Sequence, residues 1–154
     1  HQYPGRMVNI TVVVKNNGNM YETFNVTAYR NSTEIGTILV TDLGIGENTT
    51  IIFQWNTTGL TPCQNWTISA EAPIVGDINP SDNNLTDGTV KIKMIGDVNA
   101  DGVVDGEDIA IVIYAIPSFV GHPRWNQQAD LDNDGIVDGV DVAITLAKVG
   151  LKCI

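Results

Sequence analysis

The chain has 154 residues, of which 43% are hydrophobic, and a formal net charge of −10. This apolar content supports a packed core and argues against wholesale disorder, and no apolar run approaches the ~18 residues of a membrane-spanning helix. Ten of the 18 acidic residues lie between Asp97 and Asp141, where Arg124 is the one lysine or arginine. This charge distribution argues against a nucleic-acid partner. The chain opens on His1 without a basic, apolar signal segment, so we expect a mature form or a fragment.

The first half of the chain has the pattern of short β-strands. Runs that are β-branched or alternate in polarity occupy residues 7–14, 23–29, 33–40, 50–55, 65–72 and 88–94. Turn residues such as "NNGN" at 16–19 and "NPSDNN" at 79–84 separate them. Six or seven short strands at roughly regular spacing predict an all-β sandwich.

The periodicity changes after Met94. A stripe at helical spacing (Ile109, Val112, Ile113, Ile116) is followed by Pro117, and it recurs 33 residues later (Val142, Thr145, Leu146, Val149) before Gly150. Two helices are therefore predicted. We place a domain boundary near Ile95 and Gly96, which gives domains of residues 1–95 and 96–154 with almost no linker between them.

An acidic twelve-residue phrase occurs twice, at residues 97–108 and 130–141. Oxygen-bearing side chains occupy positions 1, 3, 5, 9 and 12 of each phrase, and glycine occupies position 6. Together with the position 7 carbonyls of Val103 and Ile136, the candidate ligands are Asp97, Asn99, Asp101, Asp105, Asp108, Asp130, Asp132, Asp134, Asp138 and Asp141. Seven oxygen ligands around a sharp glycine turn suit Ca²⁺ better than Mg²⁺ or Zn²⁺, so we expect two bound Ca²⁺ ions.

A strand precedes the first loop and aspartate stands at position 12, which differs from an EF-hand pair. The segments "GDVNADGVVDGEDIAIVIYAI" and "ADLDNDGIVDGVDVAITLAKVG" instead resemble the type I dockerin family, over residues 96–151. The resemblance implies two antiparallel helices with pseudo-twofold symmetry. It also implies a cohesin partner that contacts loop positions 10 and 11. Those positions here are Gly106, Glu107, Gly139 and Val140 rather than the Ser/Thr pair frequent in the family.

The segments "VVVKNNGN", "GENTTIIFQW" and "NPSDNN" resemble CARDB, the cell-adhesion-related domain found in bacteria, over residues 4–94. This resemblance implies an Ig-like sandwich. The family has a strand before the segment that matches "YPGRMVNITV", but only three residues precede Pro4 here. We expect either an open edge that accepts a strand from another chain or a differently folded start.

Seven Asn-x-Ser/Thr triplets lie before residue 87. They begin at Asn9, Asn25, Asn31, Asn48, Asn56, Asn65 and Asn84. We interpret them as N-glycosylation sites of an extracellular protein, with the alternative that Thr in strands and Asn in turns produce some triplets by coincidence.

The two cysteines, Cys63 and Cys153, are compatible with an oxidising compartment. A bond between them would clamp the helical half against the sandwich. Alternatively, each thiol is free or pairs between chains.

We find no nucleophile with a suitably placed histidine, and the carboxylates are assigned to metal ligation, so we expect no catalytic residues. The interpretation is a non-catalytic, extracellular or cell-surface glycoprotein whose role is adhesion or assembly. It is a self-assembling filament or layer subunit, or the anchor of a larger secreted protein that binds a cohesin-like partner, or a carbohydrate-binding module.

Overall fold

The computed structural model describes residues 1–77 and 79–154. They form two compact units that are each discontinuous in sequence. The sandwich unit contains Gly5–Thr58 and Asn65–Val90, and the loop unit contains His1–Pro4, Gly59–Gln64 and Lys91–Ile154. Two short segments of the first half of the sequence therefore fold together with the acidic loops.

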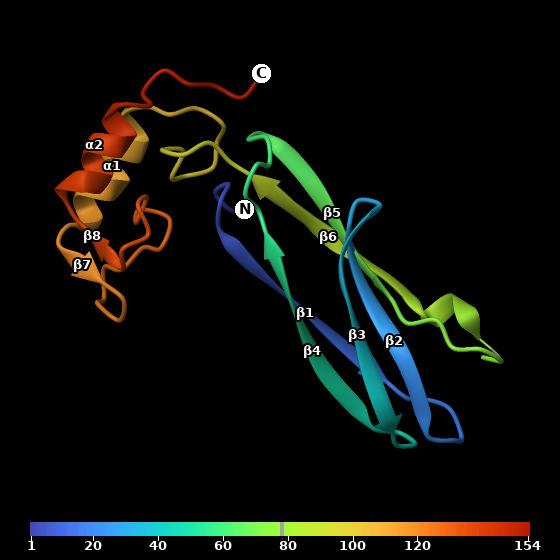
Figure 1. Cartoon of the computed structure of the whole chain (residues 1–154). Helices are drawn as coiled ribbons and strands as arrows, with labels where there is room; N and C mark the ends of the chain where they lie inside the picture. The colour runs from blue at the N-terminus through green and yellow to red at the C-terminus, as the bar shows by residue number, and fades with distance from the viewer. Residues whose placement is uncertain (78) are drawn as a thin grey trace. The chain divides into compact units, whose positions relative to one another are not determined.

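The sandwich is built from six strands. These are β1 (Met7–Lys15), β2 (Glu22–Arg30), β3 (Thr33–Leu43), β4 (Asn48–Asn56), β5 (Gln64–Glu71) and β6 (Asn84–Ile92), with a short 3₁₀ helix η1 (Pro80–Asp82) before β6. One sheet has the order β1-β4 and the other has the order β3-β2-β5-β6 (Figure 1). The strands predicted from the sequence are confirmed.

The two sheets share one apolar core. In β4, strict alternation points Ile51, Phe53 and Trp55 inward, and all three are buried. From the larger sheet, Phe24 and Val26 of β2 enter the same cluster as Ile51 and Phe53. Side chains of both sheets therefore interdigitate, as expected for a sandwich.

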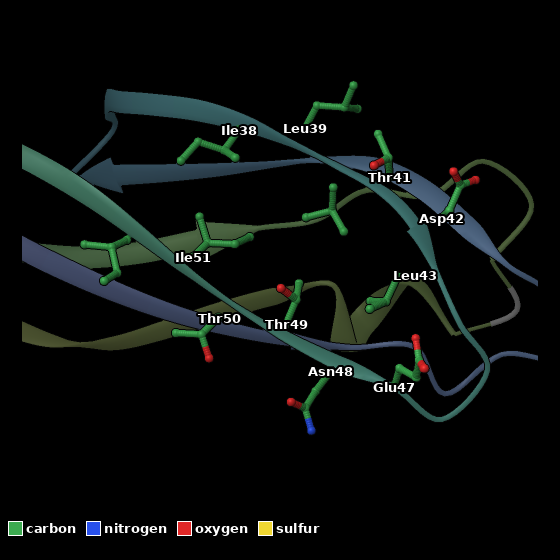
Figure 2. Close-up of a pocket in the computed structure, with 12 residues that line it drawn as sticks. Ile38, Leu39, Thr41, Asp42, Leu43, Glu47, Asn48, Thr49, Thr50 and Ile51 are labelled. Atoms are coloured by element: carbon green, nitrogen blue, oxygen red, sulfur yellow. The ribbon is translucent and has the colours of Figure 1, made fainter.

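An open groove of about 640 Å³ separates the edges of the two sheets at one side of the sandwich. Its walls are residues 38–43 of β3, Glu47 of the turn and residues 48–52 of β4; β3 and β4 flank the same tight turn but pair with different strands. Figure 2 shows the side chains of both strands along this opening, Leu43 and Ile51 among them. The groove thus exposes two strand edges together with apolar side chains.

The loop unit contains two short helices and a two-stranded ribbon. They are α1 (Gly106–Ala115), α2 (Gly139–Leu146), β7 (Ser118–Phe119) and β8 (Ile136–Val137) (Figure 1). Both helices were predicted. In the described part of the chain, neither helix is long and apolar enough to cross a bilayer.

The helical stripe predicted from the sequence faces the core only in part. Val112 is fully buried in a cluster with Val98, Ala129 and Val137. Ile113 and Leu146, which belong to the same stripes, are each 55% exposed. Two helices this short cannot bury a complete stripe against each other, so these side chains remain on the surface.

Each acidic loop pairs with the segment that follows the other loop's helix. Val103 in the first loop forms an antiparallel bridge with Lys152, and Ile136 in the second loop pairs with Phe119. Val103 and Ile136 are 33 positions apart, as are Phe119 and Lys152. The pairing of the two loops is therefore reciprocal, which is the pseudo-twofold arrangement that the dockerin resemblance implied.

Cys63 and Cys153 form a disulfide between residues 90 apart in sequence. Both belong to the loop unit. The expectation that this bond ties the sandwich to the helices is therefore wrong, because Cys63 lies in a segment that folds with the loops: its N–H donates to Ile92 O (2.6 Å). Cys153 N–H donates to Gly102 O (2.8 Å), so the bridge fastens the chain end beside the first loop.

Replacing both Cys63 and Cys153 by serine removes a constraint that the chain-entropy model values at about 4.6 kcal/mol. Because both residues lie in the loop unit, we expect its thermal unfolding midpoint to fall while the midpoint of the sandwich unit changes little. Calorimetry of wild type and the double variant at fixed calcium measures both transitions. An equal fall in the two transitions would contradict this assignment.

Candidate metal centre

Each acidic loop starts from a buried aspartate. Asp97 is 0% exposed and Asp130 is 3% exposed. The position 6 glycine of each loop donates its backbone N–H to this aspartate: Gly102 N lies 3.2 Å from Oδ2 of Asp97, and Gly135 N lies 3.1 Å from Oδ2 of Asp130. Position 1 is thereby fixed in the same way in both loops.

The tight curvature of the loops comes from two left-handed residues in each. Gly102 and Gly135 have φ of 94° and 88°, which explains the glycine at position 6. Position 4 is also left-handed, with φ of 66° at both Ala100 and Asn133. Asparagine tolerates this conformation better than alanine, so position 4 of the first loop is the more strained. This second turn was not predicted from the sequence.

Side chains at positions 3 and 5 fold back onto the loop backbone. In the first loop, Oδ1 of Asn99 accepts from Asp101 N (3.1 Å), and Oδ1 of Asp101 accepts from Val103 N (2.8 Å). In the second loop, Asp132 accepts from Asp134 N (3.3 Å), and Asp134 accepts from Ile136 N (2.8 Å). These Asx-type turns hold the side chains on the inner side of the loop.

Positions 9 and 12 also start the helices. Asp105 is the N-cap of α1 and forms a reciprocal capping box with Asp108, and Asp138 and Asp141 do the same for α2. The position 12 carboxylate reaches back as well: Oδ1 of Asp108 accepts from Val98 N (2.7 Å), and Oδ1 of Asp141 accepts from Leu131 N (2.6 Å). The order of each helix is therefore coupled to the order of its loop.

The residues present fit a hard divalent cation. In the second loop, one carboxylate oxygen from each of Asp130, Asp132 and Asp134 lies within 4.8 Å of the others. In the first loop, Oδ1 of Asp97 is buried and has no hydrogen-bond partner among the described atoms. Burial raises the pKa of the Asp97 carboxyl; Lys93 opposes this shift and Asp108 adds to it. A cation would satisfy this buried carboxylate oxygen, and an all-oxygen donor set suits Ca²⁺.

Three side chains from outside the loops hydrogen-bond the backbone of the first loop, and none of these contacts was predicted from the sequence. Lys93 Nζ donates to Val98 O (3.0 Å), and Lys91 Nζ donates to Ala100 O (3.2 Å). Tyr3 OH reaches both Asp97 O (3.4 Å) and Gln128 O (2.8 Å). The only sequence signal for the lysines was their alternation at the end of the last strand.

All seven sequon asparagines are exposed, and all lie in the sandwich unit. Asn9 of β1 and Asn48 and Asn56 of β4 lie on the outer face of the β1-β4 sheet, since their neighbours in alternation face the core. Asn25 lies on the outer face of β2. Both broad faces of the sandwich therefore carry positions that a glycan could occupy.

Two family models match the chain. CARDB matches residues 1–108, and the dockerin type I domain matches residues 95–148. The two matches overlap at the first acidic loop. CARDB and dockerin domains are non-catalytic, and dockerin domains bind calcium.

Solved structures of other proteins share parts of the fold. The CARDB domain of a Pyrococcus furiosus protein in complex with di-metal ions aligns with a TM-score of 0.53 and 24% identity, over 60% of this chain and 84% of that one. A domain of a candidate cell surface protein from Methanosarcina acetivorans aligns at 0.48 and 26%, over 59% and 82%. A type II cohesin-X-dockerin complex from Acetivibrio cellulolyticus aligns at 0.35 and 15%, over 92% and 96%.

A search of curated proteins finds no match to this chain. The CARDB match covers well over half of the sequence and agrees with the observed sandwich, and the dockerin match agrees with the paired loops and helices. Both domains are typical of secreted cell-surface proteins and act in protein interaction. The chain belongs to the CARDB family and carries a dockerin type I domain over residues 95–148.

Proposed function

We propose that the chain is a calcium-stabilised structural subunit of an extracellular filament or surface layer, which joins to further copies of itself by strand pairing. The observation that supports this proposal most is the uncovered edge of β1. The loop unit stiffens the subunit when two Ca²⁺ ions are bound, and N-linked glycans cover the outer faces of the sandwich.

The β1-β4 sheet has only two strands among the described residues, so β1 has one unpaired edge. The inward side chains of β4 are buried, whereas those of β1 are only partly buried; these are Val8, Ile10, Val12 and Val14. A strip of the core therefore remains open beside β1. A third strand laid along β1 would cover this strip and pair the free backbone groups.

A second copy of the chain is the occupant that we propose. Glycans at Asn9, Asn25, Asn48 and Asn56 would shield the two broad faces and leave the strand edges accessible. The β3–β4 groove exposes strand edges on the other side of the same sandwich. Pairing β1 of one copy with this groove of the next is a head-to-tail contact, which extends into an open filament when the rotation between copies does not close a ring.

Two Ca²⁺ ions are proposed to stiffen the loop unit. The ligands are Asp97, Asn99, Asp101, Val103, Asp105 and Asp108 in the first loop, and Asp130, Asp132, Asp134, Ile136, Asp138 and Asp141 in the second. The ions would supply the positive charge that the carboxylates need. Because positions 9 and 12 also cap α1 and α2, ordering of the loops orders the helices.

Calcium removal is expected to reduce the helical circular dichroism signal reversibly. At free calcium of about 100 times the dissociation constant, each bound ion stabilises the folded unit by about 2.7 kcal/mol. Asp141→Asn should shift the calcium dependence to higher concentration, because it weakens both the ligand and the helix cap. Asp42→Asn, an exposed position on β3 of the sandwich unit that creates no new glycosylation triplet, is the matched control and should behave as wild type. A helical signal unaffected by chelator would contradict the calcium proposal.

Strand pairing along β1 is tested by two neighbouring substitutions. Val12→Lys directs a charge toward the open strip, and Val13→Lys places the same side chain on the outer face. We expect analytical ultracentrifugation to show concentration-dependent assembly for wild type and Val13→Lys, and monomers for Val12→Lys. Near-UV circular dichroism checks that each variant is folded. Monomeric wild type at all concentrations would rule out self-assembly.

Docking into a cohesin-like receptor is the second candidate function. Its specific support is the exposed apolar surface of the helices, where Ile113 and Leu146 occupy equivalent positions 33 residues apart. A carbohydrate-binding role has less support, because exposed aromatic rings are few in the described residues: Tyr21 in the sandwich unit, and Tyr114 and Phe119 in the loop unit.

Binding to a panel of purified cohesins by surface plasmon resonance tests the docking candidate. Calcium-dependent binding should be lost in the Ile113→Glu, Leu146→Glu double variant, because the charges would enter the apolar contact. The same double variant should still self-assemble if the strand-pairing proposal is correct. Binding unaffected by the two substitutions would place the docking surface elsewhere.

A further inference from the structure

Lys93 is the most deeply buried cation of the loop unit. It is 0% exposed. Its Nζ donates to Val98 O (3.0 Å) and lies 4.2 Å from the centroid of the Tyr3 ring. Burying an ammonium is costly unless it meets acceptors and compensating charge, and here it meets a loop carbonyl, an aromatic face and the field of Asp97.

Tyr3 connects this lysine to both halves of the loop unit. The side chain is 2% exposed, and its hydroxyl donates to Gln128 O (2.8 Å), two residues before the second loop, with Asp97 O at 3.4 Å. Backbone hydrogen bonds hold this segment: Gln2 N–H donates to Lys91 O (2.8 Å), and Lys93 N–H donates to Gln2 O (2.9 Å). The first residues of the chain therefore form an extended segment that is hydrogen-bonded to the backbone on either side of Ile92, beside the Lys93 side chain.

Further hydrogen bonds and the disulfide hold the rest of the first loop. Lys91 Nζ donates to Ala100 O (3.2 Å). The C-terminal tail bonds the loop backbone through Val104 N–H to Leu151 O (2.9 Å), and the Cys63–Cys153 disulfide secures this tail. We name the set of Tyr3, Lys91, Lys93 and this disulfide the first-loop clamp.

The second loop carries one more acidic ligand side chain than the first loop. Its position 3 is Asp132, whereas the first loop has Asn99, so five carboxylate side chains face the second site and four face the first. The counterpart of Cys153 in the pseudo-symmetry is Val120, which is exposed and cannot form a disulfide. The two sites are alike in loop geometry but unequal in charge and in covalent support.

We propose that the first-loop clamp makes the two calcium sites unequal: Lys93 acts as a tethered cation that keeps the first loop ordered without a metal, and the second loop is the one whose order depends on Ca²⁺. Lys93 is a positioning residue, since it contacts the backbone of the loop and no reacting group. This inference rests on the proposed calcium binding and specifies how calcium regulates the unit.

The consequence is a stepwise response to calcium. When the ion concentration falls, α2 and the second loop lose order first, because five carboxylates repel one another there. The first loop and its covalently fastened tail stay folded. The unit therefore passes through a half-ordered state instead of unfolding in one step.

Amide hydrogen exchange of the two position 6 glycines directly compares the order of the two loops without calcium. Gly102 and Gly135 donate to equivalent aspartate oxygens, so their exchange rates can be compared. In oxidised wild type with chelator, followed by NMR, we expect Gly102 to exchange at least about tenfold more slowly than Gly135. With calcium, both amides should be protected.

Lys93→Met tests the tethered cation, and Lys152→Met is its matched control, because the Lys152 side chain is exposed in the same unit. In chelator, the Gly135 to Gly102 rate ratio should fall to about one in Lys93→Met and remain at wild-type level in Lys152→Met. If Lys93→Met does not fold with calcium, Tyr3→Phe replaces it. That variant removes only the hydroxyl and should lower the ratio partially.

Equal exchange of the two glycines in calcium-free wild type would overturn the inference. So would a Lys93→Met ratio equal to that of Lys152→Met. These outcomes differ from failure of the proposed function, in which added calcium would protect neither glycine. A ratio that collapses in Lys93→Met alone supports the clamp.

Discussion

Repulsion among closely spaced carboxylates is the constraint on which the loop unit depends. Ten acidic residues lie between Asp97 and Asp141, and the structure offsets their charge locally in two ways. Backbone N–H groups and helix N-termini receive the carboxylates at positions 1, 9 and 12, and two lysines contact the backbone of the first loop. These donors orient the side chains but leave a buried oxygen of Asp97 without a hydrogen bond. The unit is therefore organised around charge that the protein alone does not neutralise, which is why calcium is central to the proposed function.

Different interactions stabilise the two units. The sandwich relies on an apolar core formed by both sheets, and no acidic loop belongs to it. The loop unit has a small core, centred on Val112 and Val137, and adds capping boxes and a disulfide. Residues from the start of the chain and from the segment around Cys63 belong to the loop unit. The acidic loops thus have structural support that lies outside the repeated loop-helix motif, and the first loop receives most of it.

The sequence predicts those features that depend on local patterns. Strand alternation, the helical stripes and the ligand spacing are properties of neighbouring residues, and the strands and helices are found where they were expected. The burial of Val104 and Val137 at position 8 was also predictable from their place in the loop. Contacts between distant segments were not. In the sequence, Lys93 is an ordinary strand lysine, Tyr3 belongs to no pattern, and Cys63 falls in the segment predicted as sandwich. Their contacts with the loop unit form only when residues far apart in sequence meet. The capping boxes could have been found from the Asp-x-x-Asp spacing at positions 9 and 12.

A surface polymer benefits from subunits whose interaction edges form on rigid elements, and we propose that bound metal supplies this rigidity to the loop unit. This function depends on the proposed binding of two Ca²⁺ ions by each chain. Native mass spectrometry of the oxidised protein, with calcium and then after chelation, tests it most directly. We expect a mass increase of two calcium ions per chain, which chelation removes together with a shift to more highly charged, less compact species. A mass without bound calcium at saturating concentration, and a charge distribution unaffected by chelation, would contradict it.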